Sequence, residues 1–221
     1  MAKQNIEKTP PKGNIRFSIS LSEEQKAAKT EILKHPFNFV VGKAGSGKTL
    51  LAVQVALDQV FKRQFNKIII TRPTISTEDN GFLPGSEREK MEPWLVPIRS
   101  NMRKVYNKPD ILEKMEKEEK IELVSLAHFR GRTFDNAVVI VDEYQNLSKS
   151  QLAMCIGRLG KDSKMIFCGD SYQIDLRDKQ HSAYHDMAKL ANSSFVFKTV
   201  LTDSHRHAAI DDLLELLNGY H

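Results

Sequence analysis

Hydrophobic residues follow two patterns along this chain. Short apolar runs, rich in Val and Ile, have the length and composition of strands that are buried on both faces of a sheet. Between these runs, apolar residues recur every three or four positions, as they do in helices that cover a sheet. The apolar runs occupy residues 37–41, 67–71, 121–126, 137–141, 164–168 and 195–201. This alternation predicts an α/β fold, with a mostly parallel sheet and helices on both faces.

The stretches with helical spacing alternate with the predicted strands. The expected helices begin at Ser22 and continue at 50–61, 87–106, 111–120, 148–159, 181–191 and 208–217. Ser22 and Gln25 have the spacing of a capping box, in which each side chain binds the other residue's backbone N–H at a helix start. The charged segments between 87 and 120 stand between two core strands, so we expect a helical insertion there.

Length and composition indicate one folded domain. The chain has 221 residues, of which 40% are hydrophobic, and a domain averages about 150 residues. Residues 1–16 contain four basic side chains and almost no apolar ones, a composition typical of flexible tails. We therefore expect a flexible basic tail over 1–16 and a single domain over 17–221.

Charge and cysteine content narrow the class of protein only slightly. The net charge of +5 is compatible with a polyanionic partner, but the basic residues are too dispersed to identify one. Cys155 and Cys168 lie in apolar segments, so we expect no disulfide scaffold. No run approaches the roughly 18 apolar residues that span a bilayer, and the N-terminus lacks the apolar core of a signal peptide. We expect a cytoplasmic protein that does not bind a membrane.

A phosphate-binding loop follows the first apolar run. Residues 42–49 read GKAGSGKT, which is a complete G-x-x-x-x-G-K-[ST] pattern, and a stretch with helical spacing follows. Residues with small side chains expose backbone N–H groups to phosphate oxygens, and a helix N-terminus favours an anion. Lys48 is expected to reach the β and γ phosphates, and Thr49 to offer its hydroxyl to Mg²⁺. The nucleotide-binding candidates are Gly42, Lys43, Ala44, Gly45, Ser46, Gly47, Lys48 and Thr49.

An acidic pair ends the apolar run at 137–141. Asp142 stands where a Walker B carboxylate emerges from a parallel sheet and holds Mg²⁺ through water beside Thr49. Glu143 would then orient and deprotonate the attacking water, which favours hydrolysis over binding alone. Gln173 follows the next strand and is a candidate sensor of the γ-phosphate. The simpler interpretations are an acidic helix entry for the pair and a surface turn for Gln173.

Two further patterns look like functional motifs but fit local structure better. Residues 107–110 read NKPD and match the guanine motif N-K-x-D, but they precede the Walker B run instead of following it. We interpret them as a turn between helices. His181 and His185, like His205 and His207, have spacings that suit a metal, but no Cys or further His cluster completes a set. We expect these histidines to be solvated or to cap helices.

Many ordered motifs together resemble the PhoH family, ATPases often described as phosphate-starvation-inducible. Besides the loop at 42–49, they are 71–73 (TRP), 81–85 (GFLPG), 89–97 (EKMEPWLVP), 129–133 (FRGRT), 142–146 (DEYQN), 158–160 (RLG), 169–176 (GDSYQIDL) and 204–207 (SHRH). The resemblance covers about residues 21–219. It departs at Tyr144, where the family usually has Ala, and at Tyr172, where the family often has Thr.

The family's core resembles the first RecA-like lobe of superfamily 1 helicases. The resemblance implies adenine reading by Gln25, whose simpler role is the helix cap, γ-phosphate sensing by Gln173 and a phosphate contact by Arg206. It also implies a nucleic-acid face. The candidates for that face are Arg72, Arg99, Arg103, Arg130 and Arg132. The simpler interpretation of these arginines is a solvated helix and a turn paired to nearby carboxylates.

The expected function is Mg²⁺-dependent ATP hydrolysis coupled to RNA or single-stranded DNA. A helicase normally closes two RecA-like lobes on ATP, and we expect one lobe in this chain. Either identical subunits form a homo-oligomer, such as a hexameric ring, in which Arg206 acts on a neighbour's ATP, or the protein works alone. The alternative is an ATP-gated regulatory or interaction switch without translocation. A metabolic P-loop kinase fits less well, because no lid or acceptor site is visible in the sequence.

Overall fold

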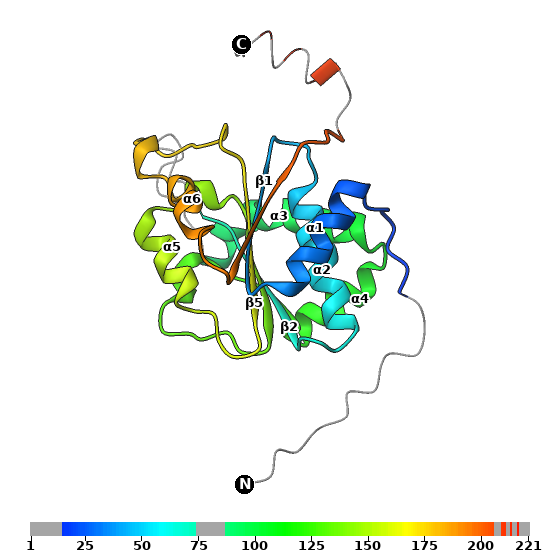
Figure 1. Ribbon diagram of the computed structural model, residues 1–221. Helices are drawn as coiled ribbons and strands as arrows, with labels where there is room; N and C mark the ends of the chain where they lie inside the picture. Colours follow the sequence, from blue (N-terminus) through cyan, green and yellow to red (C-terminus); the bar gives the residue numbers. More distant parts are fainter. Residues whose placement is uncertain (1–14, 74–86, 206–208, 211–212, 214–215, 217–221) are drawn as a thin grey trace.

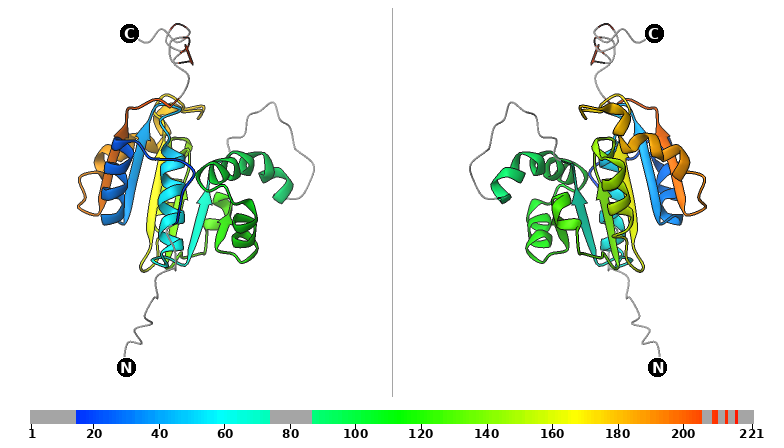
Figure 2. Two further views of the ribbon diagram at one scale, coloured as in Figure 1. Left: turned by 90° about the vertical axis from the view of Figure 1, so that its right-hand side faces the viewer. Right: turned by 90° about the vertical axis from the view of Figure 1, so that its left-hand side faces the viewer.

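The apolar runs of the sequence form one parallel sheet. The computed structural model describes residues 15–73 and 87–205, together with 209, 210, 213 and 216. Within these residues the strand order is β3-β2-β4-β5-β1-β6, and every neighbouring pair is parallel (Figure 1 and Figure 2). The strands are β1 (Phe37–Gly42), β2 (Lys67–Thr71), β3 (Ile121–Leu123), β4 (Ala137–Val141), β5 (Lys164–Gly169) and β6 (Val196–Leu201). The predicted α/β fold is confirmed.

The strand order brings three loops together. β5 lies between β1 and β4, with Val41 opposite Gly169 and Val141 opposite Phe167. In a parallel sheet the carboxyl ends of all strands lie at the same edge, where ligands of open α/β sheets bind. The loop after β1, the turn after β5 and the residues after β4 are therefore neighbours, although the chain separates them widely.

Helices cover both faces of this sheet, as the sequence predicts. α1 to α4 lie on one face, and α5 and α6 lie on the other (Figure 1). The helices are α1 (Glu23–Lys34), α2 (Lys48–Phe61), α3 (Glu87–Val105), α4 (Pro109–Lys117), α5 (Lys149–Ile156) and α6 (Met187–Leu190). Short 3₁₀ turns are η2 (Leu126–Phe129), η3 (Tyr144–Asn146), η4 (Lys179–His181) and η5 (Ala183–Asp186). Among the described helices, none has the length and apolarity to cross a membrane.

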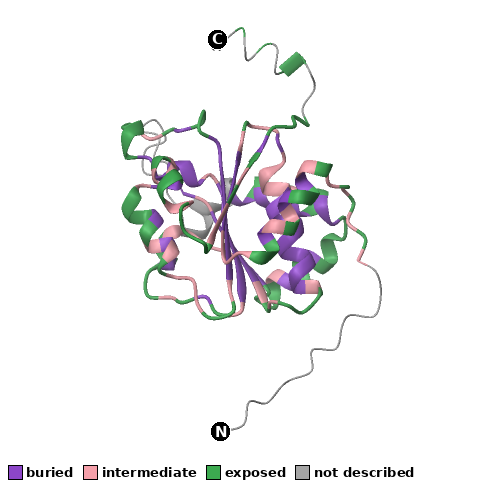
Figure 3. Cartoon of the chain, viewed as in Figure 1, coloured by how far each residue is buried: buried purple, intermediate pink, exposed green. Residues whose placement is uncertain are grey.

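Alternate strand residues enter two apolar layers. Ile68 and Ile70 of β2 belong to the layer that contains α2, whereas Ile69 between them belongs to the layer that contains α5. The central strands and the α2 residues from 51 to 60 are buried (Figure 3), so the core fixes the helix that follows the phosphate loop. Ile15 also packs against the layer that contains α2. The packed region therefore begins two residues before the expected start at 17.

Side chains close both ends of α1. Ser22 Oγ accepts the Gln25 N–H, and Gln25 Oε1 accepts the Ser22 N–H, so the predicted capping box is confirmed. At the other end, the buried Lys164 ammonium donates to the carbonyl groups of Ile32 and His35. A cation at a helix C-terminus is also favoured by the helix dipole. β5 thus holds α1, and with it Gln25, in place.

The strand predicted over 121–126 is shorter than expected. Its ladder with β2 ends where Ile70 pairs with Leu123, and the chain enters η2 at Leu126. The prediction of a strand to Leu126 was wrong because β3 is an edge strand whose one neighbour, β2, ends at Thr71.

The predictions for the helices after β4 need a similar correction. The segment 181–191 forms the end of η4, then η5 and the one-turn helix α6 instead of one helix. The side chains of Asp178 and Ser182 accept nearby backbone N–H groups and start separate turns, which compete with a continuous helix. α5 also ends earlier than the predicted 159, at Ile156. Most of the helix predicted over 208–217 lies outside the described residues.

Candidate active site

The loop after β1 needs glycine at two positions. At Gly42 (φ 154°) a Cβ atom would lie 2.4 Å from the Leu201 carbonyl oxygen. At Gly47 (φ 80°) a Cβ atom would lie 2.5 Å from Gln25 Nε2. Only glycine combines these backbone angles with so close an approach. β6 and α1 therefore hold the loop at both of its ends.

Lys48 and Thr49 extend from the end of this loop. Lys48 Nζ donates to the carbonyl oxygens of Gly42 (2.7 Å) and Lys43 (2.9 Å), so the ammonium group is held at the loop. Thr49 Oγ1 donates to Asp142 Oδ1 over 2.8 Å. This bond joins the first turn of α2 to the residue after β4. The two residues predicted to serve the metal are thus in direct contact.

Asp142 is a buried carboxyl group beside another acid. Burial, and then the charge of Glu143, raises the pKa of Asp142 from an ordinary value of 3.8 to about 6, against the opposing hydrogen bond from Thr49. A buried carboxylate beside a like charge is costly unless a cation compensates it. Mg²⁺ takes oxygen ligands from carboxylates. Thr49 and Asp142 therefore fit the cation that accompanies a nucleotide.

Two buried hydroxyls near the loop have no hydrogen-bond partner within the described part of the chain. They are Ser46 Oγ and Thr71 Oγ1. Ser46 belongs to the loop, and the carbonyl of Thr71 accepts the Asp142 N–H over 2.9 Å. Buried polar groups are nearly always paired. Unpaired hydroxyls at this edge of the sheet fit a site for a polar ligand such as a phosphate with its metal.

Both carboxylate oxygens of Glu143 are held. Gln145 Nε2 donates to Glu143 Oε2 over 2.6 Å, and Arg72 Nη2 lies 3.5 Å from Glu143 Oε1. Glu143 has a left-handed backbone conformation (φ 53°), which is uncommon for a residue with a side chain and recurs at functional sites. The acidic pair lies directly after β4, and Glu143 is also the residue before η3, so it stands at the entry of a short 3₁₀ helix as well as next to Asp142.

The turn after β5 meets the acidic pair through its backbone. The carbonyl of Gln173 accepts from Gln145 Nε2 over 3.0 Å, whereas the Gln173 side chain is exposed. Asp170, which is buried, accepts the Tyr172 N–H at Oδ1 over 2.9 Å and shapes the turn. Gln173 is therefore next to the site, and its role as a γ-phosphate sensor stays a prediction.

Gln25 and His205 meet at the phosphate loop. Gln25 Nε2 donates to the Ser46 carbonyl over 3.1 Å and lies 3.2 Å from His205 Nε2. The His205 N–H donates to the Gly45 carbonyl over 3.1 Å. His205 is exposed, which agrees with the interpretation of a solvated histidine, but its contact with Gln25 was not predicted, because a contact between residues 180 positions apart leaves no local signal in the sequence.

Glu24 fixes the segment that carries His205. Its carboxylate accepts the N–H and the hydroxyl of Thr202 (2.8 and 2.9 Å) and the N–H of Asp203 (3.3 Å). Burial acts to raise the pKa of Glu24, but these hydrogen bonds outweigh it, and the pKa is lowered. We call residues 202–205 the strap, because they connect α1 to the phosphate loop. Arg206, the next residue, lies outside the described residues.

Most of the arginines predicted for a nucleic-acid face pair with carboxylates, and their contact with nucleic acid stays a prediction. The ion pairs are Arg72 with Glu143 (3.5 Å), Arg99 with Glu116 (3.2 Å), Arg103 with Glu113 (3.6 Å) and Arg132 with Glu122 (2.6 Å). Arg130 is exposed. Arg72 thus belongs to the candidate active site, and the other pairs connect α3 with α4 and the η2 exit with β3.

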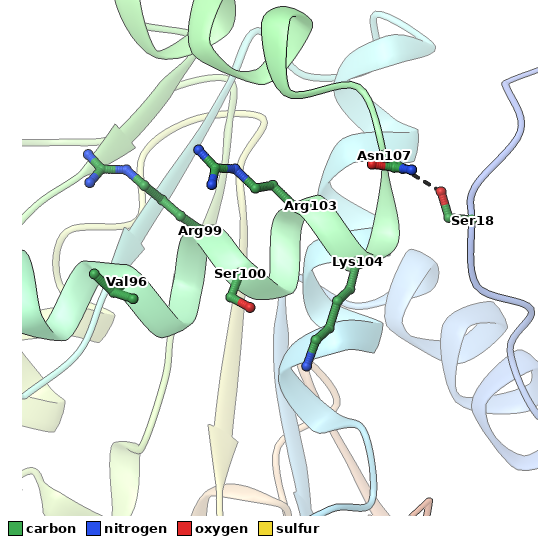
Figure 4. A pocket seen from close by; sticks show the side chains of 7 residues that line it. All are labelled: Ser18, Val96, Arg99, Ser100, Arg103, Lys104 and Asn107. Carbon is green, nitrogen blue, oxygen red and sulfur yellow. Dashed lines mark hydrogen bonds between the residues drawn. The ribbon is translucent and has the colours of Figure 1, made fainter.

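A hollow of about 740 Å³ lies on α3, away from the phosphate loop. Arg99 and Arg103 extend from the same side of α3, and Lys104 extends from another (Figure 4). The full lining is Ser18, Val96, Arg99, Ser100, Arg103, Lys104 and Asn107. The hollow carries three cationic side chains, so its chemistry suits an anionic group.

The remaining patterns have structural roles. Of residues 107–110, the first two lie in the predicted turn between α3 and α4, and Pro109 and Asp110 are the first residues of α4. His181 pairs with Asp178 over 2.8 Å, and His185 Nε2 donates to a carbonyl in η4 over 3.0 Å. Across the described residues, no group of three or more His, Cys, Asp or Glu side chains could hold a metal.

The parallel sheet with β5 between β1 and β4, the loop at 42–49 and the Thr49–Asp142 contact define a P-loop nucleoside triphosphatase domain of the RecA-like class. Residues 19–218 match the family described as PhoH-like protein. The chain belongs to the PhoH family.

Curated relatives agree with this assignment. The chain is 43% identical to a PhoH-like protein of Synechocystis sp. over 68% of this chain and 46% of the relative. It is 36% identical to a PhoH-like protein of Bacillus subtilis over 97% of this chain and 67% of the relative. The chain thus spans between about half and two thirds of the length of these relatives.

Two solved structures share the fold at low sequence identity. One is the Pif1 helicase from Candida albicans, with a TM-score of 0.50 and 18% identity over 91% of this chain and 44% of that chain. The other is the large terminase from a thermophilic bacteriophage, with a TM-score of 0.59 and 10% identity over 89% of this chain and 50% of that chain. At these identities the likeness concerns the fold.

We predict that Asp142→Asn stabilises the nucleotide-free protein. The raised pKa of Asp142 means that the wild-type fold loses stability as the pH rises from the unfolded value of 3.8 through about 6. A neutral amide removes this loss and still accepts the Thr49 hydroxyl, so the free energy of unfolding should increase by roughly 1 to 3 kcal/mol at pH 8. Urea unfolding of both proteins in EDTA measures this increase in the free energy of unfolding. The gain should shrink by about half at pH 5, and an equal gain at both pH values would contradict the raised pKa.

Proposed function

We propose that this chain is a Mg²⁺-dependent ATPase that couples hydrolysis to binding of RNA or single-stranded DNA. The observation that carries the proposal is the 2.8 Å hydrogen bond from Thr49 to Asp142, with Glu143 held directly beside it. A protein that only binds a nucleotide needs the phosphate loop and the metal site, but no further carboxylate. A carboxylate that is positioned next to the metal site and is not itself a ligand supports hydrolysis.

Each residue of the site has a defined part in this proposal. The loop N–H groups and Lys48 bind the β and γ phosphates. Thr49 and Asp142 would hold Mg²⁺, which would supply positive charge beside the phosphates. Glu143 accepts a proton from water as the water oxygen bonds to the γ phosphorus. The bond from that phosphorus to the bridging oxygen breaks and leaves ADP and phosphate. Gln173 and Arg206 stay predictions as sensor and phosphate contact.

The base of the nucleotide is read by Gln25 in this proposal. An amide has two N–H donors and a carbonyl with two lone pairs. In Gln25, Oε1 accepts from the backbone of Ser22, and Nε2 is shared between the Ser46 carbonyl and His205. Adenine can be recognised if the amide exchanges His205 for the base and keeps its contact with the loop. Selectivity for ATP thus requires the strap to release Gln25.

Two observations bear on the partner. The net charge of +5 and the cationic hollow on α3 support a polyanion. The ion pairs of Arg99 with Glu116 and of Arg103 with Glu113 favour the second candidate function, an ATP-gated switch that does not bind nucleic acid there. Assembly of identical subunits, including a hexameric ring, is part of the proposed ATPase that binds nucleic acid. In such an assembly a second copy would supply the facing lobe, and its Arg206 would contact the nucleotide of the neighbouring subunit.

We expect Lys48→Ala and Glu143→Gln to separate binding from hydrolysis. Loss of the ammonium group should abolish productive nucleotide binding. The amide at 143 keeps the shape but not the base, so turnover should fall about 10²-fold or more while binding persists. Release of phosphate and binding of a fluorescent ATP analogue measure the two effects. An undiminished turnover in Glu143→Gln would contradict the role of Glu143 as the base.

The partner can be tested with Arg99→Gln/Arg103→Gln. Neutral residues are preferable to Glu, because Glu would also repel Glu113 and Glu116. If both arginines contact phosphates, binding to labelled oligo(U) or oligo(dT) should weaken. The slope of log affinity against log salt should then decrease by about 0.7 for each lost contact.

The control for this test is Lys26→Gln/Lys34→Gln, which removes two exposed cations of α1. The proposal requires that the control keeps both the affinity and the stimulation of ATPase activity by the oligonucleotide. If the α3 variant also keeps both for RNA and for DNA, the hollow is not the nucleic-acid site and the ATP-gated switch is favoured.

A further inference from the structure

A buried amide connects the acidic pair with the turn after β5. Gln145 has no exposed surface, and its Nε2 donates both to Glu143 Oε2 (2.6 Å) and to the Gln173 carbonyl (3.0 Å). Its Oε1 accepts the Asp170 N–H over 3.1 Å. Gln145 is therefore the described residue whose side chain bonds to Glu143 and to both ends of the turn 170–173.

The position of this amide is itself fixed. The Gln145 carbonyl accepts from Ser182 Oγ over 2.5 Å. On the other side, Gly169 has no side chain, and a Cβ atom there would lie 2.9 Å from Gln145 Oε1 and 2.5 Å from the ring of Tyr144. Asn146 extends the link, because its Oδ1 accepts the Asp175 N–H over 2.8 Å. The amide thus has one orientation, with its donor toward Glu143.

Glu143 depends on such support. Its left-handed backbone does not by itself fix where the carboxylate points, and the other described partner, Arg72, is more distant at 3.5 Å. A misplacement of about 1 Å in a reacting group can lower a rate about 10²-fold. The short bond from Gln145 is the contact that sets the direction of the carboxylate.

We propose that Gln145 is a positioning residue for Glu143 and that it ties the orientation of this carboxylate to the turn 170–173. A ligand or partner that moves the turn pulls on the Gln173 carbonyl, and through the same amide it changes where Glu143 points. Hydrolysis is thereby coupled to whatever contacts the exposed residues of the turn. The inference rests on the proposed role of Glu143 as the base.

Steady-state kinetics of Gln145→Leu test the inference. Leu has a similar size but donates nothing to Glu143, so kcat should fall about 10- to 100-fold, while KM and the Kd of an ATP analogue change less than about threefold. The Asp170 N–H also loses its acceptor, so folding is checked by thermal unfolding and kinetics are measured well below Tm. The matched control is Gln54→Leu, since Gln54 is also a buried glutamine and lies within α2; its kcat should stay within about threefold of wild type.

A double-mutant cycle separates positioning from a general structural role. If Gln145 acts through the Glu143 carboxylate, Gln145→Leu should have little further effect on single-turnover hydrolysis in a Glu143→Gln background. Independent effects would instead multiply. Multiplied effects, or an unchanged kcat in Gln145→Leu beside an impaired Glu143→Gln, would overturn the inference and leave the proposed function intact. An unchanged kcat in both single variants would overturn the proposed base as well.

Discussion

The hydrogen bond between Thr49 and Asp142 is the contact on which the site depends. It spans 2.8 Å and can form only because a single strand, β5, separates the strand of the phosphate loop from the strand of the acidic pair. Both ends are rigid, since α2 is buried after its first turn and β4 is buried along its whole length. Asp142 is a buried acid beside the like charge of Glu143, and the hydrogen bond from Thr49 offsets only part of the cost of its negative charge. The fold that brings Thr49 and Asp142 together therefore also creates a place for a cation.

The same edge of the sheet connects the site with two segments that reach the surface. The strap contacts the phosphate loop through the His205 N–H and contacts α1 through Glu24. The turn 170–173 contacts the acidic pair through Gln145. In the proposed function, one segment therefore meets the end of the site that faces the base of the nucleotide, and the other meets the end that faces the γ-phosphate. Such an arrangement suits a protein whose nucleotide state is communicated to a partner.

Local patterns made the fold and the centre of the site predictable. The phosphate loop, the Ser22–Gln25 cap and the acidic pair each lie within a few consecutive residues, and backbone geometry links such residues directly. Sequence reasoning missed the contacts of Gln145 and His205, because most of their partners lie far from them along the chain. It also did not identify Lys164 as the residue that closes α1. It left the partners of Arg99 open, since Glu116 lies 17 residues away on another helix. The order of the strands, which a single sequence does not state, decides most of these contacts.

Metal-dependent nucleotide binding tests the central claim most directly. Calorimetric titration with a non-hydrolysable ATP analogue should give at least about tenfold tighter binding in Mg²⁺ than in EDTA, a difference of about 1.4 kcal/mol. Thr49→Val keeps the shape of the side chain and removes the hydroxyl. It should bind the analogue in EDTA as the wild type does and lose most of the gain from Mg²⁺. A full gain in Thr49→Val, or no effect of Mg²⁺ on the wild type, would contradict the assignment of Thr49 and Asp142 to the metal.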